Sequence, residues 1–295
     1  MSADGPPPLD PGAPIAPGHE VIAHLSRGRT LDVYDAWSVE RASRVVAKVL
    51  RPDRLGDRPA ARRLLTEGRL IRRLAHPHIV RGYEVVADPH PVVIMETLTG
   101  ATLARLIDES DPRLPVRDIA HLGMHLASGI RYLHGQGWLH LDLKPSNVVA
   151  EAGRAKLIDL GLARRPGHCP RGVGTWCYMA PEQARGGRVG PAADVWGLGA
   201  VLYEATTGQA AFDPDPPGDA PSTPPGDSAT GRPRRHPQLD GAPAPVRRLR
   251  RAPSALVGLI DACLDPDPAR RPPVDAVLGA LEPLAGLPAR ERRFS

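Results

Sequence analysis

The stretch with the strongest chemical signal is WLHLDLKPSNVV, residues 138–149. It places Asp142, Lys144 and Asn147 between two apolar ends. A buried segment excludes such groups unless they are paired or required, because removing charge from water is costly. Polar groups held rigidly by apolar flanks need not reorganise during a reaction, which is how electrostatic catalysis works. The stretch therefore predicts a loop that binds a ligand or performs chemistry.

The composition is that of a globular protein rather than of a nucleic-acid-binding or disulfide-rich one. The chain has 295 residues, of which 41% are hydrophobic and 24% charged, enough for one large domain or two small ones. The net charge of +5 is spread along the chain and forms no basic stripe with interleaved aromatic residues, so we expect no nucleic-acid partner. Cys169, Cys177 and Cys263 form no CxxC motif, which favours free thiols.

Two features favour a cytoplasmic location. The first residues lack the basic and apolar regions of a signal peptide. The longest strongly apolar run, residues 195–203, is far too short to cross a bilayer, so we expect no membrane span.

The first third of the chain has the pattern of strands around one helix. Residues 1–17 are rich in proline and are predicted to be disordered. Residues 32–38, 44–50 and 91–98 carry the β-branched and aromatic residues typical of strands. Apolar residues recur at helical spacing over 61–74, which predicts a helix.

From about residue 101 the pattern becomes helical. One long helix carries an apolar stripe at 119, 122, 126, 130 and 133. The helix over 191–208 is apolar nearly all round and should lie at the centre of its domain. Two more helices are expected near 253–264 and 273–284, whereas the Pro-, Gly- and Arg-rich residues 213–251 indicate a mobile insertion and 286–295 a tail.

These elements predict an α+β protein of two lobes. The smaller N-lobe, about 18–97, is β-rich, and the larger C-lobe, about 98–285, is helical. A cleft between two lobes is a favoured place for a ligand.

Several short motifs occur along the chain in a particular order and spacing. Together they indicate a protein family more specifically than any one motif does alone. Lys48 lies in VVAKV and Glu67 in the following helix, and HLDLKPSN contains Asp142. Asp159-Leu160-Gly161 comes 17 residues after Asp142, behind a short apolar strand, and Ala180-Pro181-Glu182 follows. From about residue 20 to 284 the chain resembles a eukaryotic-type Ser/Thr protein kinase of the kind that bacteria also carry, with a bilobal kinase fold.

The resemblance implies roles for seven side chains. Lys48 and Glu67 would form an ion pair that directs the ammonium to the α- and β-phosphates of ATP. Asp142 would accept the proton of the substrate hydroxyl, and Lys144 would offset charge on the phosphoryl group. Thr175 would contact the catalytic loop, residues 140–147. Asn147 and Asp159 would bind Mg²⁺, or Mn²⁺ in its place.

The resemblance also implies a nucleotide pocket. The glycine-rich loop would contain Ser26, Gly28 and Leu31, so that only the middle glycine is kept. The side chains at 26 and 31 are expected to weaken ATP binding or to stiffen the loop. The adenine would lie between Ala47 and Val33 above and Val149 below, with Met95 as the gatekeeper and hydrogen bonds to the backbone of Glu96 and Leu98. Two further matches are structural: Glu182 would pair with Arg271, and Asp194 would brace the catalytic loop.

A second departure from the family concerns regulation. Leu141 stands where many kinases have an arginine that binds a phosphorylated residue of the activation loop. Between Asp159 and Thr175 there is no Ser, Thr or Tyr. Both absences predict an activity that does not depend on phosphorylation of this loop.

The leading hypothesis is therefore a Ser/Thr protein kinase that uses MgATP and acts on protein substrates, with its oligomeric state open. A pseudokinase or nucleotide-binding scaffold is the alternative favoured by the altered glycine-rich loop and by Leu160 in place of the usual Phe. A small-molecule phosphotransferase would share the Asp142–Asn147 portion, but Lys144 and the Ala-Pro-Glu segment favour the protein kinases.

Overall fold

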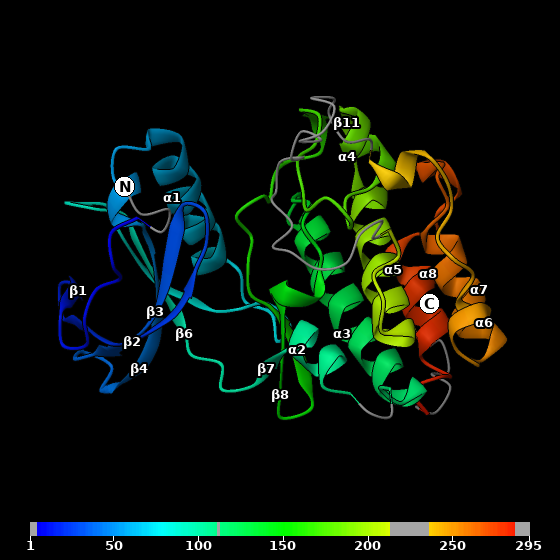
Figure 1. The fold of residues 1–295 in the computed structure, drawn as a ribbon, viewed down its shortest axis with the longest axis horizontal. Coiled ribbons are helices and arrows are strands. Elements are labelled where there is room, and N and C mark those ends of the chain that lie inside the picture. Colours follow the sequence, from blue (N-terminus) through cyan, green and yellow to red (C-terminus); the bar gives the residue numbers. More distant parts are fainter. Residues whose placement is uncertain (1–4, 111–112, 213–235, 287–295) are drawn as a thin grey trace, which may run out of the picture. The chain divides into compact units, whose positions relative to one another are not determined.

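The structure is a computed structural model that describes residues 5–110, 113–212 and 236–286. The chain divides into two compact units (Figure 1). Unit 1 comprises the residues up to Thr99 together with Asp159–Gly161, and unit 2 comprises the rest. The predicted boundary, at 97/98, lies two residues away from the one observed.

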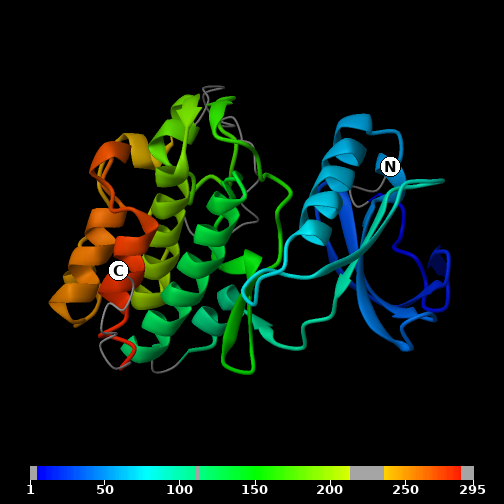
Figure 2. The same ribbon diagram turned by 180° about the vertical axis from the view of Figure 1, so that it is seen from behind.

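Unit 1 is one antiparallel sheet of six strands with a helix on one face (Figure 2). The strand order is β1-β2-β3-β4-β6-β5. Helix α1 packs on β5 and β6, and Gly68 permits this approach because a Cβ at that position would lie 2.6 Å from Val93. The elements are β1 Pro14–Ala16, β2 His19–Arg27, β3 Leu31–Ser38, β4 Ser43–Leu50, the short 3₁₀ helix Pro52–Arg54, α1 Arg58–Arg73, β5 Gly82–Val86 and β6 Val92–Glu96.

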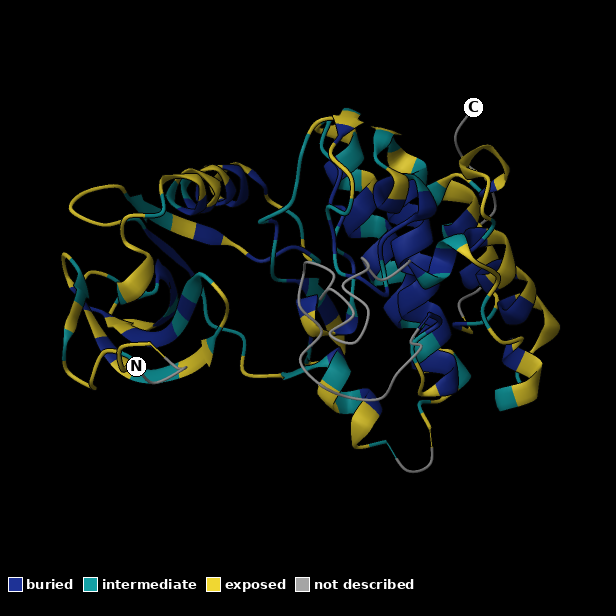
Figure 3. Ribbon diagram, turned by 45° about the horizontal axis from the view of Figure 1, so that its top comes forward, coloured by how far each residue is buried: buried dark blue, intermediate teal, exposed yellow. Residues whose placement is uncertain are grey.

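Unit 2 is a set of packed helices with two small sheets. Helix α5 runs between α3 and α7 (Figures 1 and 2), and the helices at its centre are buried (Figure 3). Its elements up to α4 are β7 Ala101–Thr102, α2 Leu103–Asp108, α3 Val116–Gly135, a 3₁₀ turn Pro145–Asn147, β8 Val148–Glu151, β9 Arg154–Leu157, β10 Gly167–Cys169 and α4 Pro181–Arg185. The others are β11 Gly187–Val189, α5 Pro191–Thr207, the 3₁₀ turn Pro237–Leu239, α6 Val246–Leu249, α7 Ser254–Cys263, the 3₁₀ turn Pro268–Arg270 and α8 Val274–Leu281.

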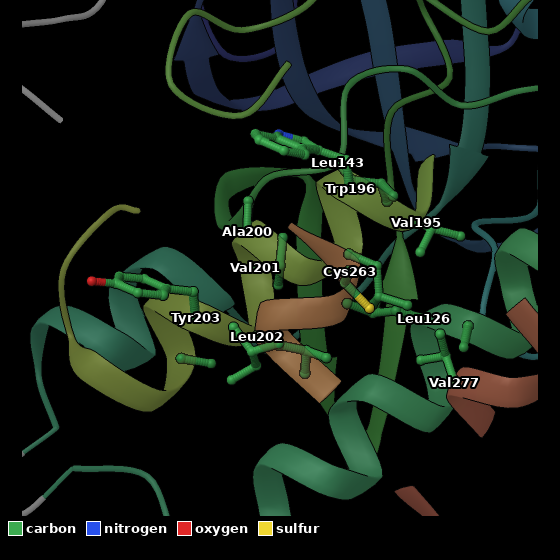
Figure 4. Close-up of a cluster of buried hydrophobic side chains, with 14 of the residues drawn as sticks. Leu126, Leu143, Val195, Trp196, Ala200, Val201, Leu202, Tyr203, Cys263 and Val277 are labelled. Atoms are coloured by element: carbon green, nitrogen blue, oxygen red, sulfur yellow. The ribbon is translucent and has the colours of Figure 1, made fainter. Parts of the chain in front are cut away.

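Helix α5 is buried on all sides because its sequence is apolar on all sides, as predicted. Trp196 and Tyr203 are among the largest fully buried side chains, and Figure 4 shows them with the neighbours of α5 from α3, α7 and α8. Gly197 lets the catalytic loop pack closely, since a Cβ there would be 2.9 Å from the Cβ of Leu143. The α+β class, with a β-rich unit and a larger helical unit, is confirmed.

Two expectations of disorder are wrong in part. Within 1–17, residues 14–16 form β1, which pairs with β2, and the N–H of Leu9 donates to the hydroxyl oxygen of Tyr34 at 2.9 Å. Within 213–251, residues 236–251 are ordered, because Val246 is fully buried and the Arg250 guanidinium donates to the carbonyl of Leu114 at 2.8 Å. Residues 1–4, 213–235 and 287–295 lie outside the described part of the chain.

Candidate active site

In unit 1, a buried lysine lies between two carboxylates. Nζ of Lys48 lies 2.9 and 3.0 Å from the carboxylate oxygens of Glu67, and 3.2 Å from Oδ2 of Asp159. Strand β4 supplies Lys48 and α1 supplies Glu67, and both residues are buried. The N–H of Leu160 also donates to Glu67, at 3.3 Å. The predicted Lys48–Glu67 pair is therefore present.

The electrostatics of this group follow from its burial. Burial raises the pKa of Glu67, against the attraction of Lys48, to about 7. Burial alone would lower the pKa of Lys48, but the charges of Asp159 and Glu67 outweigh it, and the pKa of Lys48 is raised. The lysine therefore stays charged at neutral pH, ready to bind an anionic ligand.

The raised pKa of Glu67 has a measurable consequence for stability. Between its ordinary value of 4.5 and about 7, the folded state binds a proton more tightly than the unfolded state does. The contribution of Glu67 to the free energy of unfolding is therefore greatest at low pH and falls as the pH rises through this window. Urea unfolding of wild type and Glu67→Gln should give a difference, wild type minus variant, that decreases over this window. A difference that increases would mean that the pKa of Glu67 is lowered.

In unit 2, three side chains converge on the carboxylate of Asp142. The hydroxyl of Thr175 donates to its Oδ1 at 2.6 Å, and Nζ of Lys144 lies 3.2 Å from its Oδ2. Lys144 also donates to the Thr175 oxygen at 2.7 Å. Nδ2 of Asn147 donates to Oδ2 of Asp142 at 3.1 Å and to its backbone carbonyl at 2.9 Å. The predicted catalytic-loop residues and Thr175 thus form one network.

Helix α5 holds the catalytic loop through Asp194. The buried carboxylate of Asp194 accepts from the N–H of His140 at 2.9 Å and from the N–H of Leu141 at 2.7 Å. Nε2 of His134, on α3, lies 2.7 Å from the same carboxylate. The predicted brace is present, and His134 is a partner that the sequence did not indicate.

A second predicted pair anchors the end of the segment 162–182, which we call the activation segment. Arg271 and Glu182 form two hydrogen bonds, of 2.7 and 2.9 Å, and the Arg271 side chain is fully buried. The guanidinium also donates to the carbonyl of Ala192 and lies over the ring of Trp196. This pair is the ion pair expected from the motifs.

The pairing of β3 with β4 shows that the prediction of Ala47 as a pocket residue is wrong. Val33 is the strand partner of Lys48 and Tyr34 that of Ala47, so Ala47 lies on the opposite face from Val33 and Lys48. Ala47 is fully buried in the apolar cluster that contains Tyr34. Val46, two residues before Lys48, is half-buried on the face of Val33 and Lys48. The two-residue period of the strand would have identified Val46 from the sequence.

The other nucleotide-pocket predictions fall in both units. Met95 pairs with Val46 and shares its face, and the N–H of Glu96 donates to the carbonyl of Arg81 at 2.9 Å. Leu98 follows β6 and is half-buried. Val149 is a buried residue of β8 in unit 2.

The connection between β2 and β3 takes the place of the glycine-rich loop. Gly28 donates its N–H to the carbonyl of Leu31 at 2.8 Å, and Ser26 pairs with Val33. Arg27 and the fully buried Asp32 form two hydrogen bonds, of 2.8 and 2.9 Å, across its base. An ion pair thus stiffens the loop at its base, where the sequence lacks two of the three glycines.

The residues predicted to bind metal have suitable oxygen atoms. Because Nδ2 of Asn147 is bound to Asp142, its Oδ1 is left for a cation. Asp159 accepts from the N–H of Gly161 at 2.7 Å and its side chain is 37% exposed. In the part of the chain that the structure describes, no cluster of three or more His, Cys, Asp or Glu residues could hold a metal. A few protein oxygens completed by phosphate oxygens are typical of Mg²⁺ sites.

Comparisons with known proteins agree with this geometry. Residues 19–280 match the family model of the protein kinase domain. The chain is 33% identical over 215 residues to the DNA damage-responsive serine/threonine-protein kinase RqkA of Deinococcus radiodurans, with 70% of this chain and 32% of that protein covered. It is 34% identical over 212 residues to the serine/threonine-protein kinase PknB of Mycobacterium tuberculosis, with 68% of this chain and 34% of that protein covered.

The chain thus spans about a third of the length of these relatives. Among the described residues, no helix is both long and apolar enough to cross a membrane. Since the family model covers most of the sequence, the chain belongs to the protein kinase family.

Proposed function

We propose that this chain is a serine/threonine protein kinase, which transfers the γ-phosphoryl group of MgATP to Ser or Thr hydroxyls of proteins. The observation that carries the proposal is the network of Asp142, Lys144, Asn147 and Thr175. It supplies a fixed carboxylate, a nearby ammonium and an amide oxygen for a cation. Both named relatives are serine/threonine-protein kinases.

Each side chain has one task in this reaction. The substrate oxygen forms a bond to the γ-phosphorus, its proton passes to the carboxylate of Asp142, and the bond from the γ-phosphorus to the bridging oxygen breaks to release ADP. Lys144 offsets the negative charge of the phosphoryl group during its transfer. Lys48, held by Glu67, binds the α- and β-phosphates. Asn147 and Asp159 would hold Mg²⁺, which neutralises charge on the phosphates.

We further propose that activity does not require a phosphate on the activation loop. Support comes from the sequence between Asp159 and Thr175, which has no hydroxyl side chain, and from Leu141 in place of a phosphate-binding arginine. Strand β10 in this loop pairs with β11, and the backbones of Leu139 and Arg164 exchange hydrogen bonds of 2.8 and 3.1 Å. These contacts order the loop without added charge.

One experiment tests both statements. Purified protein is treated with a phosphatase until its intact mass shows no phosphate, and is then supplied with labelled ATP, Mg²⁺ and peptides that contain Ser, Thr or Tyr. We expect label on Ser and Thr peptides from the first turnovers, with no lag, and none with Lys48→Met. Nucleotide binding without transfer to any peptide would refute the kinase proposal. A lag that ends when Thr175 becomes phosphorylated would refute phosphate independence alone.

A further inference from the structure

The backbone of Leu141 is strained at the residue before Asp142. Its φ angle is +63°, in the left-handed region that branched residues rarely adopt. Such a conformation persists only where surrounding contacts impose it. The N–H of Leu141 donates to Asp194, and its carbonyl accepts from the side chain of Gln183, the residue of α4 that directly follows the activation segment.

Gln183 links the activation segment to the catalytic loop. Its Nε2 donates to the carbonyl of Leu141 at 2.9 Å and to the carbonyl of Val173 at 2.8 Å. Its Oε1 accepts from the N–H of Ala180 at 2.9 Å. The amide can face only one way, because two carbonyls require the NH₂ group and one N–H requires the oxygen. Gln183 is 1% exposed, so loss of these bonds would leave buried polar groups unpaired.

The surrounding backbone leaves room for this link. Gly174 has a φ of +130°, and a Cβ there would lie 3.0 Å from Nε2 of Gln183 and 3.1 Å from the carbonyl of Leu141. The backbone carbonyl of Gln183 itself accepts from the N–H of Gly172 at 2.8 Å. The side-chain amide of Gln183 therefore holds both Leu141 and the segment around Val173 that leads to Thr175.

We propose that Gln183 is a positioning residue that holds the catalytic loop and the activation segment together in the arrangement that phosphoryl transfer requires. It acts through Leu141 on Asp142, and through Val173 on Thr175, the residue that bonds to Asp142. This inference rests on the proposed function for its effect on rate, but not for its effect on structure.

The matched pair Gln183→Glu and Gln238→Glu tests this proposal. Gln238 is also buried, at 3% exposed, and its Nε2 donates to two carbonyls of the same segment, those of Trp176 and Met179, both at 3.0 Å. It makes none of the contacts to Leu141. Each substitution keeps the size of the side chain and places a carboxyl group against two carbonyls, so losses of Tm should be similar.

We expect Gln183→Glu to lower kcat by about 10- to 100-fold with an unchanged KM for MgATP, because a small displacement of a catalytic group costs that much. The ratio of its kcat to that of wild type should rise as the pH falls, since a protonated carboxyl group regains one donor for Leu141 or Val173. Gln238→Glu should lower kcat much less. Equal losses of kcat in the two variants, or wild-type kcat in Gln183→Glu, would overturn the proposal.

Amide hydrogen exchange provides a readout that does not require activity. In Gln183→Glu, exchange should accelerate in the catalytic loop around Leu141 and also around Val173, whereas in Gln238→Glu the catalytic loop should exchange as in wild type. If wild type shows no phosphoryl transfer, the proposed function fails. The amide exchange rates still show whether Gln183 holds the catalytic loop and the segment around Val173 together. Unchanged exchange at Leu141 in Gln183→Glu would refute it.

Discussion

Replacing Asp142 with Asn should lower kcat by about 10²- to 10⁴-fold, which is the contribution of a positioned general base. Asn has the same shape but no basic carboxylate, and its NH₂ group would face one of the donors Thr175, Lys144 or Asn147. The KM for MgATP should change little, because Asp142 acts on the hydroxyl and not on the nucleotide. Steady-state kinetics on a Ser peptide measures both values.

The control for this variant is Asp118→Asn. Asp118 is an exposed aspartate of α3, so the same chemical change there should leave kcat unaltered. Full kcat in Asp142→Asn would show that another group accepts the proton, or that the carboxylate is not used.

Replacing Arg271 with Met should lower the free energy of unfolding by about 3–5 kcal/mol, the usual cost of leaving one partner of a buried ion pair alone. The Glu182 carboxylate is 14% exposed and takes two hydrogen bonds from Arg271. The same substitution also removes the donor to the Ala192 carbonyl. Urea unfolding monitored by Trp fluorescence gives the value.

Arg270→Met is the matched control for that measurement. Arg270 pairs with Asp265 at 3.2 Å, but its side chain is 73% exposed. Exposed pairs contribute about 0–1 kcal/mol. The double variant Glu182→Gln with Arg271→Met should recover part of the loss, because it leaves no buried charge. A loss for Arg271→Met no larger than that for Arg270→Met would contradict the assigned role of the pair.

The main elements could be predicted from the sequence because local signals agreed with their packing. The apolar stripe of α3, the all-round apolarity of α5 and the spacing over α1 all predicted helices that are present. Asp57 caps α1 by accepting from the N–H of Ala60 at 2.9 Å, so the helix begins at Arg58 rather than at the first apolar residue. The motifs also predicted which catalytic-loop side chains meet at Asp142.

Predictions from the sequence failed where a contact depends on backbone atoms or on which face of a strand a side chain occupies. The resemblance implied Ala47 as a pocket residue, although alternation along β4 places Val46 on the face of Lys48. Residues 236–251 contain few apolar residues, yet polar side chains such as Gln238 bind them to the rest of unit 2. Gln183 contacts two backbone carbonyls distant in sequence, and no periodicity or spacing indicates such a bond.

A crystal structure of the phosphate-free protein with Mg²⁺ and a non-hydrolysable ATP analogue would show whether the side chains of the candidate active site bind MgATP. We expect Lys48 to contact the α- and β-phosphates, and a metal ion bound to these phosphates to be ligated by Asp159 and by the side-chain oxygen of Asn147. We also expect the γ-phosphate to face the carboxylate of Asp142. A nucleotide bound away from Lys48, or a metal ion without either Asp159 or Asn147 as a ligand, would contradict the proposed binding of MgATP.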